Sequence, residues 1–126
     1  MKNLKLRGDI GLARMKYKFS FQEKKYDIDV DVCDTILKRA IGLMFKRKSK
    51  PLLFIFKKET RQPIHSFFCI PFIAIWFNKG KVVDIKKVMP WKPYIKPNKN
   101  FDSFLEIPSS SKYFFDFSSI NMKRFK

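Results

Sequence analysis

The sequence is poor in the residues that build metal and nucleophilic sites. Its 126 residues include one histidine, His65, and two cysteines, Cys33 and Cys69, which lie far apart and in no CxxC pattern. A metal cluster built on imidazoles is therefore excluded, and we expect both thiols to be reduced and buried rather than part of a disulfide or a metal site. No cofactor is expected.

Glycine and long apolar runs are also scarce. The four glycines form neither GxGxxG nor GxxxxGK[ST], so the phosphate-cradling loops of nucleotide-binding proteins are missing. The longest uncharged run, residues 66–78, contains Pro71 and is shorter than the roughly 20 residues that a helical membrane span needs. The charged N-terminal stretch lacks the apolar core of a secretory signal. We therefore expect a cytoplasmic protein with no membrane span.

Acidic residues are the third scarce class. Only 11 Asp and Glu stand against 28 Lys and Arg, which gives a formal net charge of +17 at pH 7. A compositional bias toward Lys would supply part of this excess, but it does not explain the shortage of acids. Because so large a charge repels itself unless something negative lies nearby, it favours a polyanionic partner, RNA or DNA ahead of an anionic membrane surface.

The apolar content is that of a folded domain. Apolar residues make up 45% of the chain, including 15 Phe, and no linker divides residues 1–126, so we expect a single basic β-rich domain. Alternating apolar and polar side chains over 16–22 and 26–33 predict two half-buried strands. The remaining patterns predict a short helix over 35–45, strands over 52–56, 64–78, 82–89 and 104–107, and a surface loop or edge over 90–97. Asn78, Lys79 and Gly80 supply turn residues, so the strands over 64–78 and 82–89 are predicted to form a hairpin.

The first two strands suggest a hairpin with a preferred register. A tight turn at residues 24–25 would set Phe21 opposite Ile28 and Lys18 opposite Asp31. A shift of one residue would set aromatic rings against carboxylates, which disfavours it. Together the patterns predict a mainly β fold of the α+β class, a compact antiparallel β barrel or sandwich with one short helix after the first hairpin.

Two groups of polar residues have both a catalytic and a structural interpretation. In a strand, His65 and Cys69 share a face and could form a nucleophile pair, but their neighbours are bulky and apolar, which favours a packed histidine beside a buried thiol. Asp27, Asp29 and Asp31 could hold Ca²⁺ or serve as acid and base, yet in a strand they would form a solvated, charge-paired row. We assign no catalytic residue and no metal ligand, and rank an enzyme last.

Basic clusters carry the functional prediction. Lysines interleaved with Trp91 and Tyr94 suit nucleic acid, since cations contact phosphates while aromatic faces stack on unpaired bases. For Trp91 itself we favour an inward orientation, because Pro90 and Pro93 would pin it onto the core. The predicted nucleic-acid-binding residues are Lys46, Arg47, Lys48 and Lys50 in one loop, Lys57 and Lys58 in the next connection, and Lys92 and Lys96 in the proline-rich stretch.

The chain is thus predicted to be a non-catalytic binding protein that contacts nucleic acid or another polyanion through lysine-rich loops. The alternative is a small-molecule or protein-interaction domain of unknown ligand, in which the charge is incidental. Lysines gathered on one face would favour the first interpretation, and scattered lysines would favour the second. The sequence leaves the oligomeric state open.

Several stretches resemble the family known as domain of unknown function 192. They are DVDVCDTILKRAIGLMFKRK over 29–48, IHSFFCIPFIAIWFNKGKVVDI over 64–85, and then MPWKPYI and FLEIP. The resemblance implies a compact, mainly β fold with one short helix and brings no established activity. The chain departs from the family in having Ile73 where an aspartate is usual, Cys69 where Met is common, and serines where a glycine follows the LE-x-P segment. If that aspartate belongs to a family site, this chain lacks it.

Overall fold

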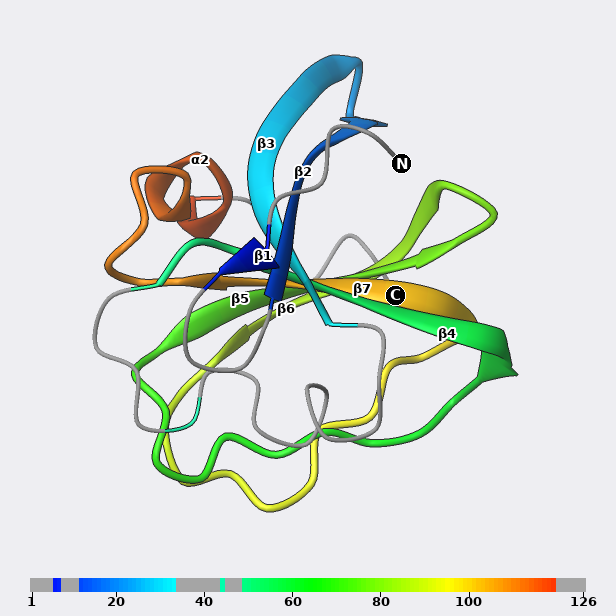
Figure 1. Cartoon of the computed structure of the whole chain (residues 1–126). Coiled ribbons are helices and arrows are strands. Elements are labelled where there is room, and N and C mark those ends of the chain that lie inside the picture. Colours follow the sequence, from blue (N-terminus) through cyan, green and yellow to red (C-terminus); the bar gives the residue numbers. More distant parts are fainter. Residues whose placement is uncertain (1–5, 8–11, 34–43, 45–48, 120–126) are drawn as a thin grey trace.

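The structure is a computed structural model that describes residues 6–7, 12–33, 44 and 49–119. One sheet of seven strands forms most of this described part. The strand order is β1-β2-β3-β4-β7-β5-β6, and Figure 1 shows that β2 and β3 rise steeply away from the other strands. The mainly β fold is therefore confirmed. The elements are β1 (Leu6–Arg7), β2 (Leu12–Phe21), β3 (Lys24–Cys33), β4 (Leu52–Thr60), β5 (Phe72–Asn78), β6 (Lys81–Val88), β7 (Phe101–Pro108) and the helix α2 (Phe114–Ser118).

The sheet departs from the expected pattern at one junction. β3 runs parallel to β4, with Val32 opposite Leu53, whereas the other strand pairs among the described residues are antiparallel. A parallel pair cannot be joined by a tight turn and needs a crossover connection. The predicted helix over 35–45 falls in this connection and, apart from Met44, lies outside the described residues.

The first hydrophobic cluster lies on the side of the sheet toward which β2 curls. Phe19 on β2 and Phe77 on β5 are not on neighbouring strands, yet their rings are 5.1 Å apart in an edge arrangement. The helix α2 covers this side, since Phe117 is fully buried and its ring lies 4.7 Å from that of Tyr26. A helix here was not predicted, because α2 has five residues and shows no extended helical period.

A second cluster fills the opposite side of the sheet. Phe54 and Phe104 stack with ring centroids 4.4 Å apart, and Trp76 is fully buried beside them. Because successive strand residues point to opposite faces, β5 feeds both clusters and is buried from Phe72 to Phe77. Burial on both faces explains why this strand reads as a continuous apolar run in the sequence.

The predicted register of the first hairpin is wrong by four residues. Phe21 pairs with Lys24, and Lys18 pairs with Asp27. The turn is formed by Gln22 and Glu23, which have φ values of 51° and 65°. Positive φ at both central residues is the geometry that matches the twist of a two-residue hairpin. Because the error is an even number of residues, the apolar side chains still occupy the predicted face.

Two other strand boundaries differ from the prediction. β4 continues to Thr60. Residues 57–60, which were expected to begin a polar connection, therefore belong to the strand. The strand expected over 64–78 begins only at Phe72, and the residues before it form an irregular loop. The predicted β5–β6 hairpin is confirmed, with Lys79 and Gly80 at φ values of 52° and 79° in its turn.

Candidate polyanion-binding surface

Two long loops, residues 61–71 and 89–100, lie against each other below the sheet as seen in Figure 1. Ile64 and Ile95 form an isolated antiparallel bridge and exchange two backbone hydrogen bonds of 2.8 Å. A third backbone bond of 2.9 Å runs from the Ser66 N–H to the Lys92 carbonyl. The loops therefore form one structural unit, which we call the paired loops.

Ser66 fixes the start of the second loop. Its side chain is fully buried, and its hydroxyl donates to the Met89 carbonyl at 2.6 Å and accepts from the Lys92 N–H at 2.8 Å. The Ser66 carbonyl also accepts from the Trp91 N–H at 3.0 Å and from the Cys69 N–H at 3.2 Å. One serine thus holds the backbone on both sides of Trp91.

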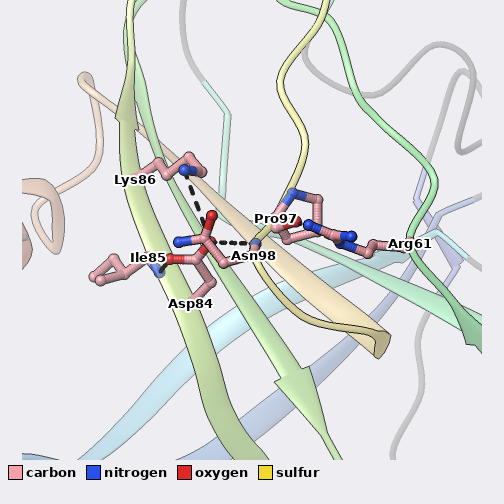
Figure 2. A network of polar contacts seen from close by, with 6 residues as sticks. All are labelled: Arg61, Asp84, Ile85, Lys86, Pro97 and Asn98. Atoms are coloured by element: carbon pink, nitrogen blue, oxygen red, sulfur yellow. Dashed lines mark hydrogen bonds and ion pairs between the residues drawn. The ribbon is translucent and has the colours of Figure 1, made fainter. Parts of the chain in front are cut away.

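Asp84 on β6 fixes the end of the same loop (Figure 2). One oxygen of this buried carboxylate accepts from the Ile85 N–H, and the other accepts from the Asn98 N–H, both at 2.8 Å. The second oxygen also lies 3.8 Å from the Lys86 ammonium. Beside it, Arg61 Nε donates to the Pro97 carbonyl at 3.0 Å and joins the two loops again. The 89–100 loop is therefore tied down at both ends.

Trp91 and Phe68 project from the paired loops. Trp91 is 59% exposed and Phe68 is 47% exposed, and their rings meet edge to face at 4.7 Å. Both have left-handed backbones, with φ values of 65° and 58°. For a bulky residue this conformation costs on the order of 1–3 kcal/mol and persists only where the surroundings impose it. Here the hydrogen bonds of Ser66 and Cys69 impose it.

The predicted inward orientation of Trp91 is wrong. Pro90 and Pro93 restrict the chain as expected, but the positive φ of Trp91 turns its ring away from the core and onto Phe68. Phe68 was missed as a candidate because its segment resembled a buried strand. The positive φ values of two aromatic residues have no local sequence signal, since such positions usually carry glycine or asparagine.

The paired loops carry cations without acids. The sequence holds no Asp or Glu over residues 60–83 or over 85–101. Lys92, Lys96 and Lys99 are exposed in the second loop, and Arg61 is exposed at the start of the first. Only Asp84 interrupts the acid-free sequence, and it is buried. Exposed cations and exposed aromatic rings therefore belong to the same paired loops, whose sequence contains no acid.

The other predicted cations do not gather in these loops. Lys57 and Lys58 are exposed, but they lie on β4 and Glu59 follows them, so their placement in a connecting loop was wrong. Lys50 is partly buried just before the strand. Residues 46–48, which hold Lys46, Arg47 and Lys48, lie outside the described part of the chain.

The Cys69 thiol and the His65 imidazole, both in the first loop, are not arranged as a nucleophile pair. His65 Nδ1 accepts from the Phe67 N–H at 3.1 Å, whereas the Cys69 thiol donates to the Phe67 carbonyl at 3.4 Å. Burial, reinforced by the nearby Glu106 carboxyl, raises the pKa of Cys69 to about 12. The thiol is therefore protonated near pH 7, and the protonated form is a poor nucleophile.

The aspartate row on β3 and the single Glu106 on β7 are the remaining carboxyl groups of interest. The aspartate row on β3 is partly ion-paired, with Lys16 Nζ 3.5 Å from Asp29, while Asp31 is buried. Glu106 on β7 is 6% exposed among apolar side chains, and burial raises its pKa to about 8.

Among the described residues, no three His, Cys, Asp or Glu side chains are grouped so that they could hold a metal ion. No helix of the described part is long and apolar enough to cross a membrane.

Comparison with known proteins places the chain among uncharacterised relatives. The sequence profile of the DUF192 family, described as "Uncharacterized ACR", matches residues 19–112. The UPF0127 protein of Pyrococcus horikoshii is 41% identical over 71 residues, which cover 53% of this chain and 62% of that protein. The UPF0127 protein of Pyrococcus abyssi is 34% identical over 88 residues, covering 67% and 74%. The chain thus spans less than two thirds of the first relative.

Two crystal structures share the fold. A protein of unknown function from Novosphingobium aromaticivorans has a TM-score of 0.74 at 15% identity, with 83% of this chain and 80% of that chain covered. A protein from Sinorhizobium meliloti, whose assignment as a transcription regulator is provisional, has a TM-score of 0.72 at 17% identity, with 80% and 84% covered. At such identities the likeness concerns the fold alone.

Proposed function

Since this chain belongs to the DUF192 family, whose description assigns no activity, we propose a function from its own surface: a non-catalytic, cytoplasmic binding protein whose paired loops contact nucleic acid. Lys92 and Lys96 would contact phosphates. The observation that carries the proposal is an acid-free, cation-bearing pair of loops held in place by the buried side chains of Ser66 and Asp84.

Preorganisation supports this choice over an incidental charge. Ordering flexible side chains and loops on binding costs affinity, so a loop that is already fixed loses less. Lysines in the paired loops extend from a backbone fixed by hydrogen bonds at Lys92 and Asn98. Cations on such a backbone suit phosphate groups, which attract them electrostatically without requiring a particular base.

Binding to a random 12-nucleotide strand, measured by fluorescence anisotropy at several salt concentrations, tests the proposal. If about six phosphates of the single strand are neutralised, affinity falls roughly 300-fold between 50 and 200 mM salt. The double variant Lys92→Gln/Lys96→Gln removes two cations, so the slope of log affinity against log salt decreases by about 1.4 for a single strand. Weaker binding to every sequence accompanies this change.

The matched control is Lys24→Gln/Lys25→Gln, which removes the same charge from exposed residues at the β2–β3 turn. This turn is at the opposite end of the molecule from the paired loops in Figure 1. The control variant retains the wild-type slope. Affinity that does not change with salt, or an equal loss in both double variants, contradicts the assignment to the paired loops.

One observation favours a second candidate, a small-molecule binding domain. Glu106 is a carboxyl group that is 6% exposed, and burial raises its pKa to about 8. A small ligand with an N–H donor, such as a primary amine, would form a hydrogen bond with this group. Calorimetric titration with alkylamines, compared between the wild type and Glu106→Gln, tests this alternative, and binding that is unchanged in the variant excludes it.

A further inference from the structure

The two exposed aromatic rings indicate which form of nucleic acid the surface would accept. We propose that Trp91 and Phe68 form a stacking platform for unpaired bases, and that the partner is therefore single-stranded nucleic acid. This inference rests on the function proposed above and specifies its ligand.

The geometry of the two rings carries the inference. They belong to different loops, and the edge contact at 4.7 Å holds them at an interplanar angle of 63°. More than half of Trp91 and nearly half of Phe68 is exposed. A ring that is already held in place and remains partly exposed can receive a base with little further loss of its own freedom on binding.

The backbone shows that this exposure is imposed by the fold. Both residues have positive φ, where glycine would fit without steric cost, and both nevertheless carry large aromatic side chains. Hydrogen bonds from Trp91 and Cys69 to the Ser66 carbonyl hold the conformation. Two strained positions in contact, each presenting a ring outward, match the occurrence of such strain at ligand-binding sites.

Charge identifies the class of occupant. Lys92 follows Trp91 directly, Lys96 lies on the same loop, and the surrounding sequence of both loops has no exposed acid. Rings beside cations match a strand that offers base faces and phosphates in alternation. A duplex keeps its base faces stacked inside, so the rings would add nothing to the binding of a duplex.

The experiment separates stacking from charge. Fluorescence anisotropy measures the affinity of the wild type for four 12-mers: mixed-sequence single-stranded RNA, the corresponding DNA, a DNA duplex, and an abasic DNA strand with the same phosphates. We expect at least one base-bearing single strand to bind more tightly than the abasic strand, by roughly 5- to 150-fold for each stacked base. The duplex should bind more weakly than that strand.

Variants assign the effect to residues. Trp91→Ala is expected to lose the advantage of the base-bearing strand while keeping the abasic affinity and the salt slope, and Phe68→Ala should lose part of the advantage. Trp91→Tyr retains a ring and should restore most of it, so a folding defect in Trp91→Ala cannot hide the result. The matched control is Phe115→Ala, which removes a ring that is 75% exposed on α2 and should change nothing.

Intrinsic fluorescence gives a second measurement. The chain has two tryptophans, and Trp76 is fully buried, so quenching by an added strand reports on Trp91. Base-bearing strands should quench this emission, and the abasic strand should not.

Several results would overturn the inference. They are equal affinity for abasic and base-bearing strands, a duplex that binds as tightly as either single strand, and equal effects of Trp91→Ala and Phe115→Ala. If salt-dependent, lysine-dependent binding persists in these cases, the stacking platform fails while the proposed function stands. If no strand binds at low salt, the proposed function fails as well.

Discussion

Glu106 offers the sharpest test of the packing described above. Its side chain is 6% exposed on β7, between Leu52 on β4 and Ala74 on β5 in the strand register. Burial disfavours the charged carboxylate and raises its pKa from 4.5 to about 8. Between these two values the folded protein binds a proton that the unfolded chain has released, so the free energy of unfolding falls as the pH rises.

The magnitude follows from the size of the shift. Each unit of pKa difference corresponds to about 1.4 kcal/mol, so the shift from 4.5 to about 8 corresponds to a loss of about 5 kcal/mol at most. This stability is fully present below pH 4.5, decreases through the intermediate range, and is lost once the pH exceeds about 8. Such a loss is a large part of the 5–15 kcal/mol typical of a domain.

Urea unfolding of the wild type and Glu106→Gln at pH 5, 7 and 9 measures the effect. The amide is nearly the same size as the carboxyl group and does not ionise, so the variant should lack this part of the pH dependence and become more stable than the wild type at pH 9. Glu59→Gln, at an exposed position near the end of β4, is the control and should follow the wild type. Parallel curves for the wild type and Glu106→Gln would refute the argument from burial.

Two further predictions concern the backbone. Ser66→Ala leaves the Met89 carbonyl and the Lys92 N–H without their buried partner and should lower the free energy of unfolding by about 2–4 kcal/mol, measured by urea titration. An unchanged unfolding midpoint would contradict this role, and Ser110→Ala on an exposed turn is the control. Gly80→Ala adds a Cβ that meets no atom within 4 Å, so its positive φ alone should cost about 1 kcal/mol and lower Tm by roughly 4 °C, and a larger loss would indicate an unseen clash.

Local signals in the sequence were sufficient where structure is determined locally. The β5–β6 hairpin was predicted because Asn78, Lys79 and Gly80 supply turn chemistry between two apolar runs. Alternation in β2 and β3 predicted the buried face of each strand. It could not determine which residues pair, because a shift of two or four residues retains the face, and the turn at Gln22 and Glu23 lacks a glycine to mark it.

Only the charged half of the candidate surface could be predicted from the sequence, for a different physical reason. Lys92 and Lys96 were selected from charge, which is a property of the sequence itself. The position of Trp91 depends on Ser66, whose hydrogen-bond partners Met89 and Lys92 are 23 and 26 residues away along the chain. Nothing near Ser66 distinguishes it from a serine on a strand, so the sequence did not indicate that it organises a loop.

The same long-range hydrogen bonds explain how the fold tolerates the strained backbone of the two ring-bearing residues. A left-handed Trp91 and a left-handed Phe68 each oppose folding, and glycine at either position would remove the strain. The buried hydrogen bonds of Ser66 and Asp84 act in the opposite direction and hold the loop in the strained form. Part of the free energy that these hydrogen bonds contribute therefore offsets the backbone strain at the two exposed rings and does not add to the net stability of the fold. Such a local cost is expected where a surface is selected for ligand binding as well as for folding.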